Sequence, residues 1–143
     1  MATLFVEIVT PEAALWAGEA LALIARSSDG DFTILPQHTS TVGDIVPGIV
    51  RVQTNDGELS FCVHGGYFQV GPDDAPEVTR ATVLAGIAEK TTEIDVARAE
   101  TAKDAAEAQL AGAARGESID PVTQRLAEES LARAQLRLSV SAN

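Results

Sequence analysis

The chain has 143 residues, 45% of them hydrophobic, so it is long enough for one compact domain or a small domain with an appendage. Its formal net charge of -11 opposes binding to phosphate backbones and argues against nucleic-acid recognition. Its longest apolar run, residues 20–25, is far shorter than the ~18 residues of a membrane span.

Many short strands are predicted for the first part of the chain. Residues 4–9 alternate between two faces, which is the two-residue period of a sheet segment. The same alternation flanks Asn55-Asp56-Gly57, a strong hairpin signal. Frequent turns between short runs predict a β-sandwich or flattened barrel. The predicted strands are residues 4–9, 21–25, 32–35, 50–54, 59–63, 67–70 and 82–85.

Two helices are predicted for the last part of the chain. Thr92 is a suitable N-cap for a helix that ends near Leu110. Glycines mark a turn over residues 111–118. Asp120 and Pro121 then provide an N-cap and a first helical residue for a second helix that ends near Val140. The short turn implies an antiparallel hairpin.

Alanine dominates one face of each predicted helix. Alanine favours helix formation, but each buried alanine contributes roughly 2 kcal/mol less than leucine would. We therefore expect helices that keep their own shape while docking weakly, as a movable element would, although an alanine-rich tail without such a role has the same composition. The face residues are Ala99, Ala102, Ala106, Leu110 and Ala113 on the first helix, and Ala127, Leu131, Ala134 and Leu138 on the second.

The composition also divides the chain in two. All six aromatic residues precede residue 69, whereas 13 of the 24 alanines lie in residues 91–143. The net charge is -9 over residues 1–93 but only -2 over residues 94–143. We therefore predict an α+β protein with a β-sandwich domain over residues 1–88 and a C-terminal antiparallel two-helix hairpin over residues 89–143.

Several sequence blocks occur together in one order along most of the chain. They are VTPE at residues 9–12, SDGDFTILPQH at 28–38, PGIVRV at 47–52, GGYFQV at 65–70, TVLA at 82–85 and IDVARA at 94–99. Together these blocks resemble the epsilon subunit of bacterial F-type ATP synthases. The fold of that family, an N-terminal β-sandwich followed by a C-terminal helical hairpin, is also the fold predicted above.

The resemblance implies a non-catalytic rotor subunit of the proton-translocating enzyme. The sandwich would couple the gamma subunit to the membrane ring of c subunits, which places the chain peripherally on the cytoplasmic face of the cell membrane. The hairpin would extend toward the alpha and beta subunits and inhibit ATP hydrolysis. The ring-facing loop would contain Asp29, Gly30, Asp31, Phe32 and His38, and the contacts with the beta subunit would come from Arg125, Arg133 and Arg137.

The resemblance also implies that ATP is a regulatory ligand of the folded hairpin, while no cofactor is required. Guanidinium groups from two helices would converge on the phosphates, which suits their fixed donor geometry. The same arginines could instead pair with Asp95, Glu100 or Glu129 on solvated faces. The implied ATP-binding residues are Glu89, Ile94, Asp95, Arg98, Ala99, Arg133 and Arg137.

The chain departs from the family pattern at a few positions. Gln37 occupies a position where the family usually has glycine, and Ala105 one where it often has a basic residue. The connection over residues 71–81 and the helical turn over residues 111–120 are longer than usual.

The other reactive residues are interpreted structurally. Cys62 excludes an internal disulfide, is typical of a reducing compartment and is predicted to be a small core residue. The first residues do not resemble a secretory leader, so secretion is not expected. His38 and His64 are too few and too separate for a metal set, and Asp29-Gly30-Asp31 is predicted to be a turn, so no metal is expected.

The sequence is also compatible with two other classes of protein. An enzyme would need a convergent set of acid, base or nucleophile, and no such set is evident in the sequence. The stronger alternative is a free-standing β-sandwich adaptor with a helical interaction tail. Co-purification with a gamma subunit would distinguish that adaptor from a rotor subunit.

Overall fold

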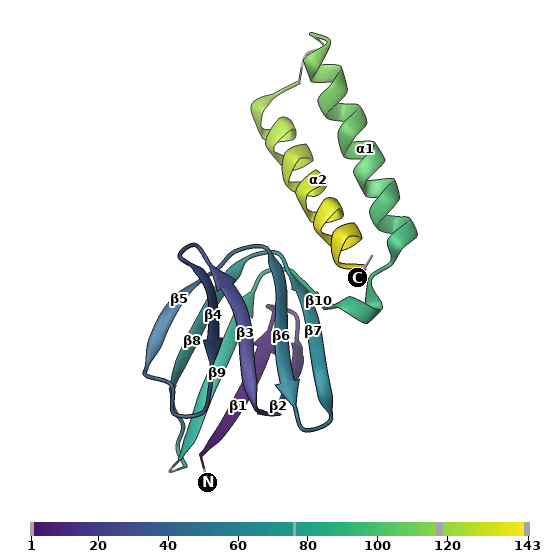
Figure 1. Cartoon of the computed structure of the whole chain (residues 1–143). Helices are drawn as coiled ribbons and strands as arrows, with labels where there is room; N and C mark the ends of the chain where they lie inside the picture. The colour runs from purple at the N-terminus through teal and green to yellow at the C-terminus, as the bar shows by residue number, and fades with distance from the viewer. Residues whose placement is uncertain (1, 76, 117–118, 142–143) are drawn as a thin grey trace. The chain divides into compact units, whose positions relative to one another are not determined.

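The computed structural model describes residues 2–75, 77–116 and 119–141, which form two compact units (Figure 1). The first unit ends at Lys90 and the second begins at Thr91. This boundary lies two residues beyond the predicted one because residues 88–90 form a strand that pairs within the first unit. A β-sandwich followed by two helices is the predicted fold class, which is confirmed.

In the described residues, the sandwich has ten strands in two five-stranded sheets. One sheet has the order β2-β1-β9-β8-β5 and the other has the order β10-β7-β6-β3-β4. Neighbouring strands are antiparallel except for the parallel pair β1 and β9. The strands are β1 (Thr3–Val9), β2 (Ala14–Ala20), β3 (Ala22–Ser27), β4 (Gly30–Ile34), β5 (Thr41–Ile45), β6 (Gly48–Thr54), β7 (Gly57–Val63), β8 (Gly66–Pro72), β9 (Val78–Ala85) and β10 (Ala88–Lys90).

The seven predicted strands overlap seven of the ten observed ones. The predicted hairpin is confirmed, because Thr54 pairs with Gly57 and leaves a two-residue turn between β6 and β7. The prediction did not include β2, β5 and β10. These strands contain alanine, glycine and charged residues, which have low β-propensity, and pairing with neighbouring strands holds them in the sheet.

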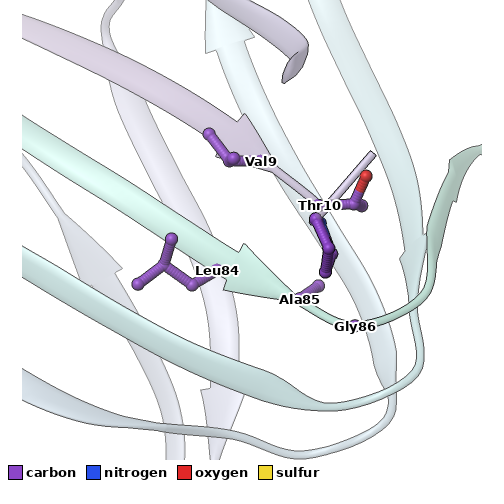
Figure 2. Close-up of a pocket in the computed structure, with 6 residues that line it drawn as sticks. Val9, Thr10, Leu84, Ala85 and Gly86 are labelled. Atoms are coloured by element: carbon purple, nitrogen blue, oxygen red, sulfur yellow. The ribbon is translucent and has the colours of Figure 1, made fainter. Parts of the chain in front are cut away.

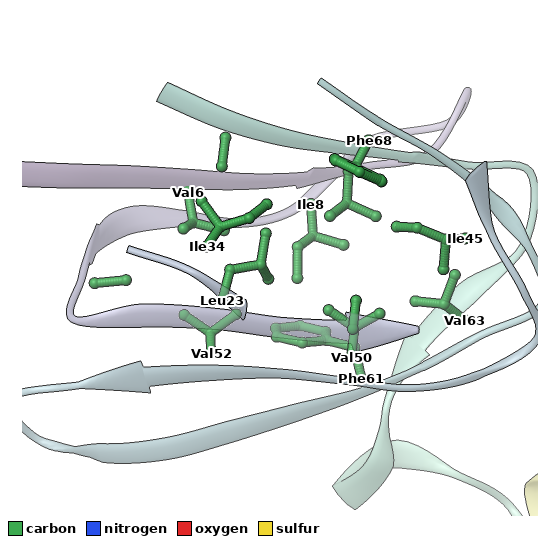
Figure 3. Packing of buried hydrophobic residues seen from close by; sticks show 14 of the residues in the cluster. Val6, Ile8, Leu23, Ile34, Ile45, Val50, Val52, Phe61, Val63 and Phe68 are labelled. Carbon is green, nitrogen blue, oxygen red and sulfur yellow. The ribbon is translucent and has the colours of Figure 1, made fainter. Parts of the chain in front are cut away.

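The core lies between the inner faces of the two sheets (Figure 3). Alternate residues of β1 are fully buried, as its two-residue period predicts. Phe61 is the largest fully buried side chain, and the ring of Phe32 stacks on that of Phe68 with their centroids 4.4 Å apart. These contacts give the first unit a complete hydrophobic core of its own.

The second unit contains η1 (Thr91–Glu93), α1 (Val96–Ala114) and α2 (Pro121–Ser141). The predicted N-cap at Thr92 is wrong because Thr92 lies in η1 and Asp95 caps α1. The Oδ1 atom of Asp95 accepts a hydrogen bond from the backbone N–H of Arg98 at 3.0 Å. Helix α1 ends at Ala114, beyond its predicted end, and residues 117–118 of the predicted turn lie outside the described residues.

The two helices lie antiparallel and side by side (Figure 1). Ala99 and Ala106 of α1 and Ala127 and Ala134 of α2 are buried, as the predicted faces require. The longer side chains on these faces, such as Leu131, are only partly buried. Alanine therefore occupies the most buried positions of the seam between the helices, and the apolar area that each position buries is small.

Asp120 caps α2, as predicted. Its Oδ1 accepts a hydrogen bond from the backbone N–H of Thr123 at 2.9 Å, and its Oδ2 accepts one from the Thr123 hydroxyl at 2.5 Å. The Thr123 hydroxyl and then the Thr123 N–H hold the pKa of Asp120 below its usual value of 3.8. Because the folded-state pKa is the lower one, the cap stabilises α2 above pH 3.8, and this contribution is lost as the pH falls through the folded-state value.

We expect Asp120→Ala to accelerate hydrogen exchange severalfold at the first-turn amides of α2 at neutral pH, because the Thr123 N–H loses its acceptor. In strong acid the variant and the native chain should converge, since the native carboxyl is then protonated. Asp120→Asn keeps an acceptor oxygen and should show a smaller effect without the acid transition. Equal exchange of the Thr123 amide in Asp120→Ala and the native chain at neutral pH would exclude this capping role.

Candidate functional site

The predicted ring-facing segment, residues 29–38, is two turns separated by strand β4. One turn, which contains Asp29, joins β3 to β4; Asp29 and Asp31, the second residue of β4, are exposed. The other turn follows β4 and leads to His38, whose Nδ1 lies 2.8 Å from the Thr39 carbonyl oxygen. The four steps from Gly30 to Ile34 separate the two turns by about 13 Å. Asp29, Gly30 and Asp31 therefore lie together, His38 lies apart from them, and Phe32 packs on Phe68.

Gln37 has a backbone conformation that favours glycine. Its φ angle is 68°, in the left-handed region. Its backbone N–H donates a 2.8 Å hydrogen bond to the Oγ1 atom of Thr79, which is only 5% exposed. Glycine adopts this conformation without steric cost, which agrees with the glycine that the resemblance implies at this position. Gln37 retains the turn because its backbone N–H, rather than its side chain, makes this bond.

We expect Gln37→Gly to raise the free energy of unfolding by about 0.5–1 kcal/mol. Glycine removes a left-handed steric cost of about 1–2 kcal/mol and adds a flexibility cost of about 0.5–1 kcal/mol. The same replacement at Gln69, an exposed strand position, should lower the stability instead. Urea unfolding of the two variants measures both signs, and a loss of stability in Gln37→Gly would refute the argument.

The hairpin brings most of the predicted ATP-binding residues to one of its ends. Asp95 caps α1, Arg98 lies in its first turn, and Arg133 and Arg137 lie in the last part of α2. Because the helices are antiparallel, the start of α1 and the end of α2 lie together, and η1 contacts α2 there. Arg133 and Arg137 are four residues apart and share one helical face.

These residues differ in their hydrogen bonds, packing and exposure. The Asp95 carboxylate accepts the Arg98 N–H, and Ala99, only 2% exposed, packs in the hairpin seam. Ile94 is partly buried, whereas the Arg98 side chain is exposed. Ile94, Asp95 and Ala99 therefore have structural roles at the start of α1, and the arginines contribute positive charge there.

Arg125 lies in the first half of α2, away from Arg133 and Arg137 along the helix. Its Nε atom is 3.9 Å from Oε1 of Glu129, and both side chains are more than half exposed, at 71% and 52%. Such an exposed pair contributes little stability. The three arginines predicted to contact a beta subunit are therefore spread over more than two turns of α2.

Glu89 lies in the first unit, on strand β10, and the other predicted ATP-binding residues lie in the second. Its Oε1 atom is 3.7 Å from Nε2 of His64, and the same nitrogen is 3.7 Å from Sγ of Cys62. The sequence predicts no metal set from the two histidines, His38 and His64. The structure instead groups His64 with a cysteine and a carboxylate. The pairing of β10 with β7 creates this group, and the sequence did not predict β10.

Cys62 is fully buried but does not belong to the hydrophobic cluster between the sheets. Its neighbours in β7, Phe61 and Val63, do belong to that cluster. Because successive side chains of a strand point to opposite faces, Cys62 lies on the outer face of its sheet. The prediction of a small buried core residue is confirmed, although Cys62 lies outside the cluster that fills the space between the two sheets.

An apolar strip crosses three strands on the outer face of the other sheet. Val9 of β1 pairs with Leu84 of β9, which pairs with Tyr67 of β8. Leu84 is 46% and Tyr67 65% exposed. Toward the opposite end of this face, Arg80 contacts Glu7 and Asp73 and lies over the ring of Phe5.

A pocket of about 330 Å³ adjoins this strip at the ends of β1 and β9 (Figure 2). Its lining is mostly apolar, so an apolar group of a ligand or partner would be buried there favourably. Sequence reasoning missed both features because only the β1–β9 and β8–β9 registers align these residues. The lining residues are Val9, Thr10, Pro11, Leu84, Ala85 and Gly86.

Comparison with known protein families decides the assignment. The beta-sandwich domain of the ATP synthase delta/epsilon chain matches residues 3–91, and the long alpha-helix domain of the same chain matches residues 92–142. The chain belongs to the ATP synthase delta/epsilon family. The predicted resemblance to an epsilon subunit is confirmed. Because the two units match the two domains of this family in order, a synthase subunit is favoured over a free-standing adaptor.

Relatives within the delta/epsilon family cover almost the whole chain. The ATP synthase epsilon chain of Alkalilimnicola ehrlichii is 41% identical over 90% of this chain and 88% of its own length. That of Halalkalibacterium halodurans is 36% identical over 99% of this chain and 98% of its own. These relatives are named as a subunit of the synthase, which agrees with the predicted class.

A solved structure supports the fold of this family member. A chain in the mitochondrial ATP synthase of Euglena gracilis, solved with OSCP, F1 and the c-ring, matches with a TM-score of 0.74 and 19% identity. The match covers 100% of this chain and 83% of that one. Neither helix in the described part of the chain is long and apolar enough to cross a bilayer.

Proposed function

We propose that the chain is a central-stalk rotor subunit that joins gamma to the c-ring and regulates ATP hydrolysis through its helical hairpin. The observation that carries this proposal is the division into two units, a sandwich with its own core and a hairpin held by alanines. Such a hairpin can change its packing without unfolding the sandwich. Both units match this family along their length.

The sandwich supplies the rotor contacts in this proposal. The apolar strip formed by Val9, Leu84 and Tyr67 has the exposed apolar area that a protein partner would cover, and we assign it to gamma. The exposed turn at Asp29 and Asp31 is assigned to the c-ring. These contacts would hold the chain peripherally on the cytoplasmic face of the membrane, within the assembled complex.

The hairpin supplies the regulation. In its extended form it reaches the alpha and beta subunits, where Arg125, Arg133 and Arg137 contact the beta subunit. The net charge is -2 over residues 94–143 and -9 over residues 1–93. The helices would therefore be repelled only weakly by an acidic partner surface. Because alanine buries little area, the folded form is only weakly favoured and a partner can compete for it.

ATP binds the folded hairpin in this proposal. Arg98, Arg133 and Arg137 come from the two helix segments that meet at one end, where they supply donors for a triphosphate. A ligand that binds only this form stabilises it by roughly 1.4 kcal/mol at ten times its Kd. That energy shifts the population of a weakly docked hairpin about tenfold.

Reconstitution of the synthase tests the regulatory role. The complex with the full chain should hydrolyse ATP more slowly than the complex with residues 1–90, while both retain gamma. Leu84→Glu, which charges the apolar strip, should instead weaken association with gamma. Equal hydrolysis rates would refute inhibition by the hairpin, and unchanged gamma binding by Leu84→Glu would refute the assigned interface.

Calorimetry with the isolated full chain tests the nucleotide site. Arg133→Ala should weaken ATP binding by about tenfold or more, since a charged hydrogen bond contributes about 1.5–3 kcal/mol. Arg125→Ala is the matched control in the same helix and should bind ATP as the native chain does. An absence of heat at millimolar ATP would overturn the nucleotide proposal and leave the rotor role intact.

A further inference from the structure

Three metal-ligand side chains share one face at an edge of the sandwich. Cys62 is the penultimate residue of β7, and His64 follows two positions later on the same side. Glu89 of β10 pairs directly opposite Cys62, so its side chain points to that same face. Two backbone features fix the arrangement: the β7–β10 register and the hydrogen bond from the His64 N–H to the Ile87 carbonyl, at 3.0 Å.

The two distances from His64 to its partners are close to those of a metal site. Their ligand atoms all lie within 4.8 Å of one another. With Zn–S near 2.3 Å and Zn–N near 2.0–2.1 Å, a tetrahedral site separates sulfur from nitrogen by about 3.6 Å and nitrogen from oxygen by about 3.4 Å. The observed separations of His64 Nε2 from Cys62 Sγ and from Glu89 Oε1 are both 3.7 Å. The third separation, from Cys62 Sγ to the Glu89 carboxylate, is at most 4.8 Å, so the partly exposed Glu89 side chain would move by up to about 1 Å to complete the site.

The burial of the group also suits a metal ion. Cys62 is 0% exposed and the His64 side chain 5%, whereas the Glu89 side chain is 27% exposed. Two ligands are therefore shielded from water, and the third is partly exposed and so accessible to an ion and a water molecule. A thiolate with an imidazole selects zinc over magnesium or calcium, which prefer oxygen ligands.

We propose that Cys62, His64 and Glu89 bind one zinc ion, with water as the fourth ligand. Binding replaces the thiol proton of Cys62 with the metal and releases that proton to solvent, so no oxidant or reductant is needed. The ion would connect β7 to β10, a strand of only three residues that precedes the helical unit in the chain. The site lies wholly in the first unit and does not depend on the proposed ATP site.

Titration of the metal-free full chain with Co²⁺ and with Zn²⁺ tests the proposal. We expect one equivalent to bind, with a thiolate-to-cobalt charge-transfer band that zinc abolishes. Zinc should also raise the unfolding temperature of the chain. The absence of both the band and zinc binding would show that the group is a hydrogen-bonded cluster without metal, and would overturn the proposal.

Variants assign the ligands. Because the Glu89 side chain is partly exposed, the Glu89→Gln variant should fold. It should keep the cobalt band and bind zinc with an affinity lower by about tenfold or more. Cys62→Ser should lose the band. Glu58→Gln, a carboxylate change on the exposed part of the same strand β7, is the matched control and should bind like the native chain. Zinc binding unaffected by Glu89→Gln and Cys62→Ser would overturn the assignment.

Discussion

Gly66→Ala is expected to lower the free energy of unfolding of the sandwich by about 3 kcal/mol, at the upper end of the usual cost of overpacking. A Cβ atom at this position would lie 2.2 Å from the carbonyl oxygen of Leu84 and 3.1 Å from the Cα atom of Ala85. Both atoms belong to the backbone of β9, the strand that pairs with β8. Relief of the clash therefore requires the two strands to separate, because no side chain can rotate away.

The matched control is Gly86→Ala, where a Cβ atom would have no neighbour within 4 Å. Gly43→Ala should be intermediate, because its added atom would lie 2.6 Å from the ring of Phe68, a side chain rather than the backbone of a paired strand. Denaturant midpoints of the three variants, at a common slope, measure the order. A midpoint for Gly66→Ala equal to that of Gly86→Ala would contradict the close packing of β8 on β9.

The sequence predicts those strands in which hydrophobic residues alternate with other residues and the hydrophobic ones face the core. In β1, Leu4, Val6 and Ile8 are fully buried, so the hydrophobic pattern and the burial pattern coincide. Strands β2, β5 and β10 have weaker hydrophobic alternation. Their extended conformation depends on pairing with a neighbouring strand, which the sequence pattern does not reveal. Sequence periodicity reports burial, and it does not report pairing partners.

The same distinction governs the functional residues. Asp95 and Arg98 could be assigned to a helix end because they are close in the sequence, and the antiparallel hairpin then brings the end of α2 to them. Cys62 and Glu89 are far apart in the sequence and meet only through the β7–β10 register. A site made by strand pairing is invisible until the partner strand is known.

The alanine seam sets how the hairpin can act. Local helix propensity holds each helix, whereas docking of one helix on the other depends on small contacts at positions such as Ala106 and Ala134. A change at one buried alanine should therefore separate the helices without affecting the core of the sandwich. This property makes the seam the point at which the folded form of the hairpin is most sensitive to substitution.

Ala134→Glu is expected to disrupt the folded hairpin, at a cost of about 3 kcal/mol or more, because Ala134 is 0% exposed and a carboxylate there would lose its hydration. Hydrogen exchange should accelerate along α1 and α2 and remain slow in the sandwich, whose core is separate. If ATP binds the folded hairpin, the same variant should lose its calorimetric ATP signal. The measurement thus links seam packing to the proposed nucleotide site.

The control for this substitution is Ala132→Glu, two residues earlier on the exposed face of α2. It adds the same charge to the same helix, so it should leave hydrogen exchange and ATP binding close to those of the native chain. A general effect of negative charge would accelerate hydrogen exchange and weaken ATP binding in both variants alike. Protection of the hairpin amides in Ala134→Glu equal to that in Ala132→Glu would show that the alanine seam does not hold the helices together, and the regulatory argument built on weak docking would then fail.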